Sequence, residues 1–388
     1  MDMEWHRDAG DQPLFAMLER LNPSGTLQRV LRQASQGSAL PQFARFATYR
    51  CTSVPQERAK GSRGLNENRW LQRGDQSKLW SQHGSQSHWD RIAMLVEHVD
   101  SRAAAGFRVS PDRVVLDIER FATDKGRWLK IAGGLKAEVM DWVFLKRPQH
   151  DAEVLVELGT FIGYTAIRLG CSICRSYLHT PVMTLEIDPL QACIARHFVN
   201  LAGLARCVEV CIGQVRDLLP RLVEDFGSRS MSFAFLDYKG NAFHEDMGSI
   251  ERLGLACPAA HSLADNTVSP GCPLYVWRMA HSTSWSLTAW CVEEFLEPEQ
   301  EDWMLMSELQ RPTAGEPGPA APASWCGLAW TTEHIRRRAE GMRPAEGFLS
   351  AGDRAAFAQL VRCHYTSFGI EAIPWSLRDR ANAVVAKP

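Results

Sequence analysis

The residues with the clearest potential for ligand chemistry lie in a short apolar segment and the turn after it, at 154–165. There Glu157, Gly159 and Gly163 form an E-x-G-x-x-x-G pattern. Glycine lets a backbone approach a ligand closely, but this is not the G-x-G-x-x-G spacing of a dinucleotide pyrophosphate site. Glu186 ends the next apolar segment, where an acid can accept hydrogen bonds from both hydroxyls of a ribose. The pattern therefore favours a nucleoside ligand without phosphates.

Further segments follow these residues in order, at 212–222, 235–237 and 263–273. Together with the first turn and Glu186, they resemble the core of the S-adenosylmethionine-dependent small-molecule O-methyltransferases, and specifically the catechol O-methyltransferase family. The most specific of them is 263–273, which contains Asp265 and Asn266. Upstream, 125–128 and 131–133 resemble the helical cap that closes over donor and substrate. The resemblance covers roughly 114–309, about half of the chain.

The resemblance implies that S-adenosyl-L-methionine is the methyl donor and cofactor. It assigns donor binding to residues of the cap, the first turn and the ends of three strands: Ala132, Glu157, Gly159, Gly163, Tyr164, Thr165, Glu186, Ile187, Gly213, Gln214, Val215, Arg216 and Asp237.

The resemblance also implies a metal site made of Asp237, Asp265 and Asn266. Hard oxygen ligands of this kind suit Mg²⁺, which keeps its other octahedral positions for substrate and water. Two vicinal hydroxyls could chelate the ion, and the ion would lower a hydroxyl pKa and orient the oxygen. Methyl transfer is then an in-line displacement that depends mostly on positioning. We therefore expect Mg²⁺-assisted methyl transfer to a hydroxyl of a small catechol-like diol.

The expected general base departs from the family pattern. The family has a lysine three residues after the first metal-binding aspartate. An ungapped comparison places Gly240 there, and Lys239 lies one residue earlier. Either a one-residue shift lets Lys239 act as the base, or the base is absent, and the sequence leaves both open.

The expected substrate residues are Trp128, Lys130, Asn266 and Glu297. Trp128 is a candidate pocket wall. Lys130 stands at the cap position where the family usually has a methionine beside the sulfonium. The family's acid that holds a catechol hydroxyl corresponds to Glu294 or Glu297, of which Glu297 is our expected residue.

Other functions stay open. One is a protein that binds S-adenosylmethionine but has lost or altered its turnover, and another is a methyltransferase with a different acceptor, such as a protein or an acyl thioester. A nicotinamide-dependent enzyme is disfavoured by the glycine spacing.

The elements that must position these residues follow a strand–helix alternation. Strands are predicted at 154–158, 182–187, 208–212, 232–237 and 261–265, with helices from 165, at 189–201, at 215–226 and at 243–255. This predicts an α/β fold, a Rossmann-like doubly wound methyltransferase sheet that is mostly parallel. Segments 285–292 and 303–309 predict an antiparallel edge, and three helices between 89 and 145 predict a helical N-terminal cap. Such sheets bind ligands at the carboxyl ends of their strands, where these acids lie.

The expected domain organisation has four parts. Residues 1–86 form an Arg-rich extension, weakly ordered or helical, and 87–309 form the methyltransferase domain with its cap. A Pro/Gly/Ala linker covers 310–324. Residues 325–388 form an extension that packs on the core, with one amphipathic helix around 356–364.

Composition limits the class of protein. The 388 residues carry a formal net charge of -2, with 45% hydrophobic and 23% charged residues, which excludes disordered and fibrous proteins and argues against nucleic-acid binding by the whole chain. No apolar run reaches the ~18 residues of a membrane span, and no secretory signal is present. The 11 cysteines do not form a disulfide framework, and the C-x-x-C at 171–174 lacks a second pair for zinc. We expect a cytoplasmic protein acting on a small molecule, with organellar targeting as the alternative.

Overall fold

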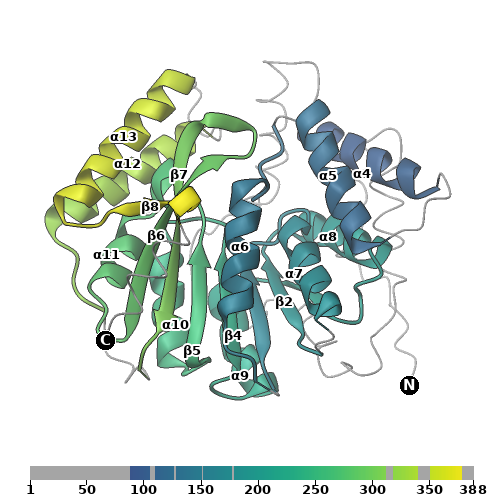
Figure 1. Cartoon of the computed structure of the whole chain (residues 1–388), viewed down its shortest axis with the longest axis horizontal. Coiled ribbons are helices and arrows are strands. Elements are labelled where there is room, and N and C mark those ends of the chain that lie inside the picture. The colour runs from purple at the N-terminus through teal and green to yellow at the C-terminus, as the bar shows by residue number, and fades with distance from the viewer. Residues whose placement is uncertain are drawn as a thin grey trace, which may run out of the picture.

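One mixed sheet organises the molecule. The computed structural model describes residues 88–104, 110–125, 128–150, 152–176, 179–311, 318–339 and 350–377. Across these residues, eight strands pair in the order β3-β2-β1-β4-β5-β7-β6-β8 (Figure 1). The strands are β1 (Val154–Leu158), β2 (Val182–Glu186), β3 (Val208–Ile212), β4 (Met231–Leu236), β5 (Ala256–Ala264), β6 (Trp285–Glu294), β7 (Glu297–Leu309) and β8 (Ala372–Pro374).

The direction of the strands confirms the predicted Rossmann-like sheet. Strands β1 to β5 pair in parallel, and β7 runs antiparallel to both β5 and β6. Strand β8 adds to the far edge, parallel to β6. The carboxyl ends of the parallel strands therefore meet along one edge, and the β6–β7 hairpin is attached beside them.

Helices cover both faces of the sheet (Figure 1). They are α4 (His88–Ala104), α5 (Pro111–Asp124), α6 (Leu135–Lys146), α7 (Tyr164–Arg175), α8 (Pro189–Leu201), α9 (Val215–Phe226), α10 (Phe243–Arg252), α11 (Pro273–Ala280), α12 (Ala323–Ala339) and α13 (Ala351–Ser367). Leu155 and Phe233 pack with α4 to α8, whereas Val154 and Val156 pack with α9 to α13. Successive strand residues point to opposite faces, and both faces of β1 are buried, so every residue of the strand except Glu157 is apolar.

Two helix starts follow the chemistry of their first residues. Ser110 accepts a hydrogen bond from the backbone N–H of Arg113, and Pro111 opens α5. Asp188 caps α8 in the same way before Pro189. A short polar side chain satisfies the free N–H groups of the first turn, and proline loses no bond there. The cap and core helices therefore begin where the sequence predicts.

The C-terminal region differs from the prediction, because it contains two helices, α12 and α13, where one was expected. Earlier in the chain, the π-helical turn η3 (Thr267–Gly271) follows β5 and leads into the short helix α11. Trp325 of α12 stacks on Tyr365 of α13 with ring centroids 5.4 Å apart. The predicted extension at 1–86 and the linker residues 312–317 lie outside the described residues.

Ten cysteines of the described residues are free thiols. No helix in the described ranges is long and apolar enough to cross a membrane.

Candidate active site

The predicted side chains gather at the carboxyl edge of the parallel strands. Glu157 lies in β1, Glu186 ends β2, Asp237 follows β4 and Asp265 follows β5. The strand ends stay in register past the last residue of the sheet: Asp237 N donates to Leu158 O at 3.0 Å, and Asp265 N donates to Leu236 O at 3.0 Å. The fold therefore aligns these acids along one edge, as the parallel sheet requires.

Gly159 joins the turn after β1 to the residue that follows β4. Its φ is +101°, and a Cβ atom there would lie 2.3 Å from the carbonyl oxygen of Asp237. Gly163 has φ +85°, and a Cβ atom on it would lie 3.1 Å from Ala195. These positions need glycine because the backbones approach too closely for a side chain and because φ is positive.

Two buried acids line the predicted donor site. Glu186 accepts hydrogen bonds from the backbone N–H groups of Phe161 and Asp188, each at 2.8 Å. Burial raises the pKa of Glu186 even though these bonds lower it. Glu157 accepts a hydrogen bond from the Thr184 hydroxyl, and burial raises its pKa well above the ordinary value. Glu186 thus stands at the end of β2, where an acid can hold ribose hydroxyls.

The other predicted donor residues differ in their burial and in their contacts with these acids. Gly213 N donates to Glu186 O at 2.9 Å, which brings the loop after β3 to the end of β2. Ile187 is 43% exposed, an unusual exposure for isoleucine next to a buried strand. Tyr164 is buried, and its hydroxyl donates to Glu119 of α5. Arg216 is exposed beside Asp217.

The remaining predicted donor residues occupy defined backbone positions. Ala132 and Thr165 are buried, Gln214 is the residue before α9, and Val215 is the first residue of that helix.

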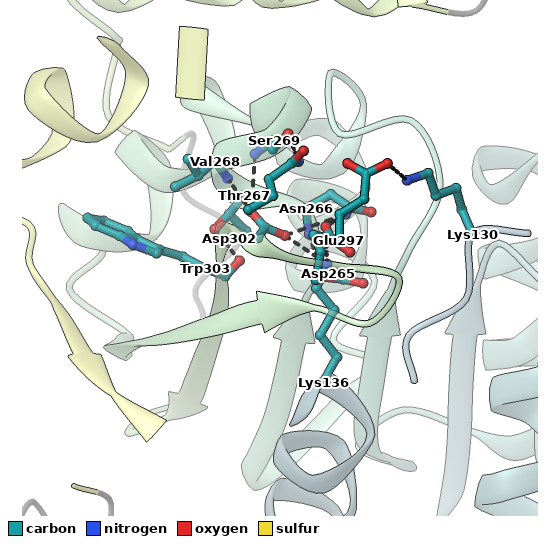
Figure 2. A network of polar contacts seen from close by, with 12 residues as sticks. Lys130, Lys136, Asp265, Asn266, Thr267, Val268, Ser269, Glu297, Asp302 and Trp303 are labelled. Carbon is teal, nitrogen blue, oxygen red and sulfur yellow. Dashed lines mark hydrogen bonds and ion pairs between the residues drawn. The ribbon is translucent and has the colours of Figure 1, made fainter. Parts of the chain in front are cut away.

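A lysine that sequence reasoning missed lies at the predicted metal site. Lys136, in the first turn of α6, is 1% exposed. Its Nζ atom is 2.8 Å from Asp265 Oδ1, 2.7 Å from Glu294 Oε1 and 2.9 Å from Asp302 Oδ2 (Figure 2). Burial opposes its positive charge, but the three acids outweigh burial and raise the pKa of Lys136 well above its ordinary value. The ammonium group therefore stays charged.

Asp302 of β7, which the sequence analysis also did not identify, fixes the loop after β5. It is fully buried, and its Oδ1 accepts hydrogen bonds from the backbone N–H groups of Val268 at 3.0 Å and Ser269 at 3.1 Å. Thr267 donates its hydroxyl to Trp303 O at 2.6 Å. These bonds, drawn in Figure 2, hold the turn η3 against β7 and so position Asn266 just before it.

Asn266 links the two predicted metal-binding aspartates. It adopts φ +56°, a conformation that asparagine tolerates better than most residues. The side-chain amide is oriented so that its nitrogen meets an acceptor and its oxygen meets a donor. In this orientation, Nδ2 donates to Asp237 Oδ1 at 3.2 Å, and Oδ1 accepts from Lys136 Nζ at 3.1 Å. The structure thus brings Asp237, Asp265 and Asn266 to one place.

The charge of this cluster suits an additional cation. Asp237, Asp265, Glu294 and Asp302 face the single positive charge of Lys136. Burial raises the pKa of Asp237 to about 6 and that of Asp265 well above its ordinary value, in each case against the lowering effect of Lys136. Among the described residues, no three His, Cys, Asp or Glu side chains form a ready-made metal site. The predicted set has two carboxylates and one amide, and these oxygen donors fit Mg²⁺.

The expected base position has no room for a side chain. A Cβ atom on Gly240 would lie 2.9 Å from the Cβ atom of Cys272 and 3.1 Å from Gly271 O. Lys239 next to it is exposed. The ungapped position is therefore closed to any base, which leaves Lys239 as the candidate from this segment.

The predicted substrate residues come from the cap and the β6–β7 hairpin. Lys130 Nζ lies 3.0 Å from Glu297 Oε1, and Arg354 of α13 lies 3.7 Å from Glu297 Oε2. Trp128 packs edge-to-face against Phe121 with ring centroids 6.3 Å apart. Lys130 and Glu297 are therefore brought together, as Figure 2 shows, while Trp128 packs on the cap helices.

Comparison with known proteins is consistent with this geometry. The model of the O-methyltransferase family matches residues 145–248. Catechol O-methyltransferase from Sus scrofa is 32% identical over 142 residues, which cover 36% of this chain and 73% of that protein. A probable O-methyltransferase from Mycobacterium tuberculosis is 30% identical over 202 residues, covering 50% of this chain and 82% of that protein.

A further relative is covered less completely. Catechol O-methyltransferase from Bos taurus is 30% identical over 179 residues, which are 46% of this chain and 62% of that protein. The chain therefore spans less than two thirds of the length of this relative.

Proposed function

Because this chain belongs to the catechol O-methyltransferase-like family of S-adenosylmethionine-dependent O-methyltransferase enzymes, we propose that it methylates a hydroxyl of a small catechol-like diol in the cytoplasm, assisted by Mg²⁺. The observation that carries the proposal is the convergence of Asp237, Asp265 and Asn266 beside the turn of Gly159. A methyl donor and a metal-bound acceptor would meet at this point of the sheet edge.

The donor side of the proposal rests on the ends of β1, β2 and β3. Glu186 would exchange part of its bonding to the backbone N–H groups of Phe161 and Asp188 for the ribose hydroxyls. Ile187, exposed after β2, offers an apolar surface to the adenine ring, and Gly159 lets the chain pass close to the ligand. S-adenosylmethionine, when bound, supplies an electrophilic methyl group.

The acceptor side rests on the metal set and the cap. Asp237, Asp265 and Asn266 would hold Mg²⁺, which would lower the pKa of a chelated hydroxyl. Glu297 would accept a hydrogen bond from the diol, and Lys130 holds Glu297 in place. Trp128 would form part of the pocket wall, and Lys239 is the candidate base. Positioning of the two reactants would supply most of the rate enhancement.

The closed space at Gly240 favours one alternative, a protein that binds S-adenosylmethionine but has lost or altered its methyl transfer. A radiolabelled methyl-transfer assay on a panel of catechols, with Mg²⁺ and with chelator, distinguishes an active catechol methyltransferase from this alternative. We expect transfer to at least one catechol that rises with Mg²⁺. Donor binding without transfer to any diol would favour the alternative or a different acceptor.

Asp265 offers the most direct test of the metal assignment. Replacing it removes a carboxylate from the predicted metal set, so Asp265→Ala should abolish both turnover and Mg²⁺ dependence. An Asp265→Ala enzyme with full activity in chelator would refute the assignment.

A further inference from the structure

The Lys136 ammonium group lies among the side chains proposed to hold the metal. Asp265 and Asn266, two of the three predicted ligands, each turn an oxygen toward it, at 2.8 Å and 3.1 Å. We propose that Lys136 is a resident cation of this site, which holds the ligand oxygens in place without metal and competes with a divalent cation, so that metal binds weakly and reversibly. This inference rests on the metal assignment of the proposed function.

Lys136 cannot easily leave this position. Its side chain is 1% exposed, and it lies in the first turn of α6, which packs against β5, β6 and β7. Glu294 and Asp302 also hold the Nζ atom, at 2.7 Å and 2.9 Å, and Asp302 is itself fixed by two backbone N–H groups. Removing an ammonium ion from the buried Asp265 and Asp302 and the half-buried Glu294 would leave uncompensated charge, which is costly.

The same arrangement leaves uncompensated negative charge that would attract a divalent ion beside Lys136. Asp237 has no ion pair with Lys136 within 4 Å in the described structure, and its Oδ1 faces the Asn266 amide. One positive charge therefore does not balance the four carboxyl groups of the cluster. A second cation is attracted by the remaining acids and repelled by Lys136, because like charges a few ångströms apart in a buried site interact strongly. The positive charge of Lys136 therefore lowers the affinity of the site for a divalent cation.

Binding of Mn²⁺, measured by electron paramagnetic resonance without donor or acceptor, tests this inference. We expect Lys136→Met and Lys136→Gln to bind Mn²⁺ at least tenfold more tightly than the wild type. Glutamine has no charge but can still donate to Asp302, so it guards against a folding defect in the methionine variant. Lys146→Met is the matched control, because Lys146 is exposed at the other end of the same helix, and its Mn²⁺ affinity should equal that of the wild type.

A second measurement uses the wild type alone. If Lys136 holds the cluster together, chelator should leave the unfolding midpoint unchanged. A midpoint several degrees lower in chelator would show that a metal ion holds the cluster together, and this would overturn the inference. Equal or weaker Mn²⁺ binding by a folded Lys136→Gln variant would also overturn it.

Failure of the inference differs from failure of the proposed function. Equal Mn²⁺ affinity in wild type and variants, with Mg²⁺-stimulated methyl transfer intact, rejects only the role of Lys136. No Mn²⁺ binding by any of the proteins rejects the metal assignment and the inference together.

Discussion

At the scale of single residues, Gly159 determines how closely the predicted donor and metal sites can lie. Its missing Cβ atom would stand 2.3 Å from the backbone oxygen of Asp237, which is not a flexible side-chain end that could move away. The turn after β1 and the residue after β4 therefore touch. A methyl donor held by this turn would lie next to a metal held by Asp237.

Gly159→Ala should consequently destabilise the fold by about 3 kcal/mol or more, because it adds a backbone clash to an unfavourable positive φ. Gly203→Ala is the control, since Gly203 has φ +72° but nothing lies within 4 Å of the position that a Cβ atom would take. It should cost only the strain of that φ, about 1–2 kcal/mol. Urea unfolding measures both, and equal losses would contradict the argument.

Asp246 gives a pH-dependent prediction. Burial raises its pKa from 3.8 to about 6, against a lowering effect of Arg216, and the Tyr238 hydroxyl donates to it. Because the folded-state pKa lies above the unfolded one, Asp246 stabilises the fold below pH 3.8, and this contribution is lost as pH rises through about 6.

Asp246→Asn, which mimics the protonated acid, should therefore gain stability over the wild type between pH 4 and pH 7, by about 1 kcal/mol after allowance for solvent screening. Unfolding curves of both proteins at several pH values check this. A stability difference that is constant with pH would mean that Asp246 keeps its ordinary pKa.

The residues that sequence reasoning missed had no local signal. Lys136 lies in the first turn of a helix that also carries Glu138, Asp141 and Lys146, so the sequence does not distinguish it from a lysine that reaches solvent. Asp302 lies inside a strand rather than at its end. Only the packing of α6 against the β6–β7 hairpin joins these residues to Asp265, and that contact spans more than a hundred residues of sequence.

At the scale of elements, the loop that carries Asn266 is held from two sides. Asp302 of β7 fixes it from the sheet, and Tyr365 of α13 donates its hydroxyl to Thr267 O at 2.9 Å from the C-terminal helices. Both partners of that second bond are buried. The C-terminal helices therefore support the loop that positions a predicted metal ligand.

Tyr365→Phe should cost about 0.5–1.5 kcal/mol, because Thr267 O loses one buried hydrogen bond but keeps the Cys272 N–H at 3.3 Å, while the ring packing on Trp325 remains. Ser367→Ala provides the control, since the exposed Ser367 hydroxyl bonds only to a carbonyl of its own helix, and it should change stability by less than about 0.5 kcal/mol. Thermal and urea unfolding compare the two variants; a neutral Tyr365→Phe would show that the bond does not support the loop.

The elements themselves were predictable where the pattern was simple. Short, mostly apolar segments such as 154–158 and 208–212 predict buried parallel strands, and Asp188-Pro189 predicts a helix start. Helix α12 was not predicted because its inward face carries Trp325, Leu328, Thr332 and Arg336, a mixture of apolar and polar residues that hides the helical period. Its burial depends on α11 and α13, which the sequence around it does not reveal.

At the scale of the whole molecule, the sheet brings the predicted donor residues and the acidic cluster to one edge. The ends of β1 to β3 carry the predicted donor residues, and the ends of β4 and β5 with the β6–β7 hairpin carry the acidic cluster. A ligand seated across this edge would contact elements from both halves. Binding should therefore stabilise the entire sheet rather than one segment.

S-adenosylhomocysteine, the product of the donor, tests this property without any acceptor. A ligand that binds only the folded state at one hundred times its Kd adds about 2.7 kcal/mol of stability, which raises the Tm of a domain of this size by roughly 5–10 °C. We expect this shift in a single cooperative transition, and none with NAD, because the E-x-G-x-x-x-G turn lacks the pyrophosphate-binding spacing. Glu186→Gln should reduce the shift, since an amide replaces the carboxylate proposed to accept hydrogen bonds from both ribose hydroxyls. A larger shift with NAD than with S-adenosylhomocysteine would reverse the assignment of the donor site.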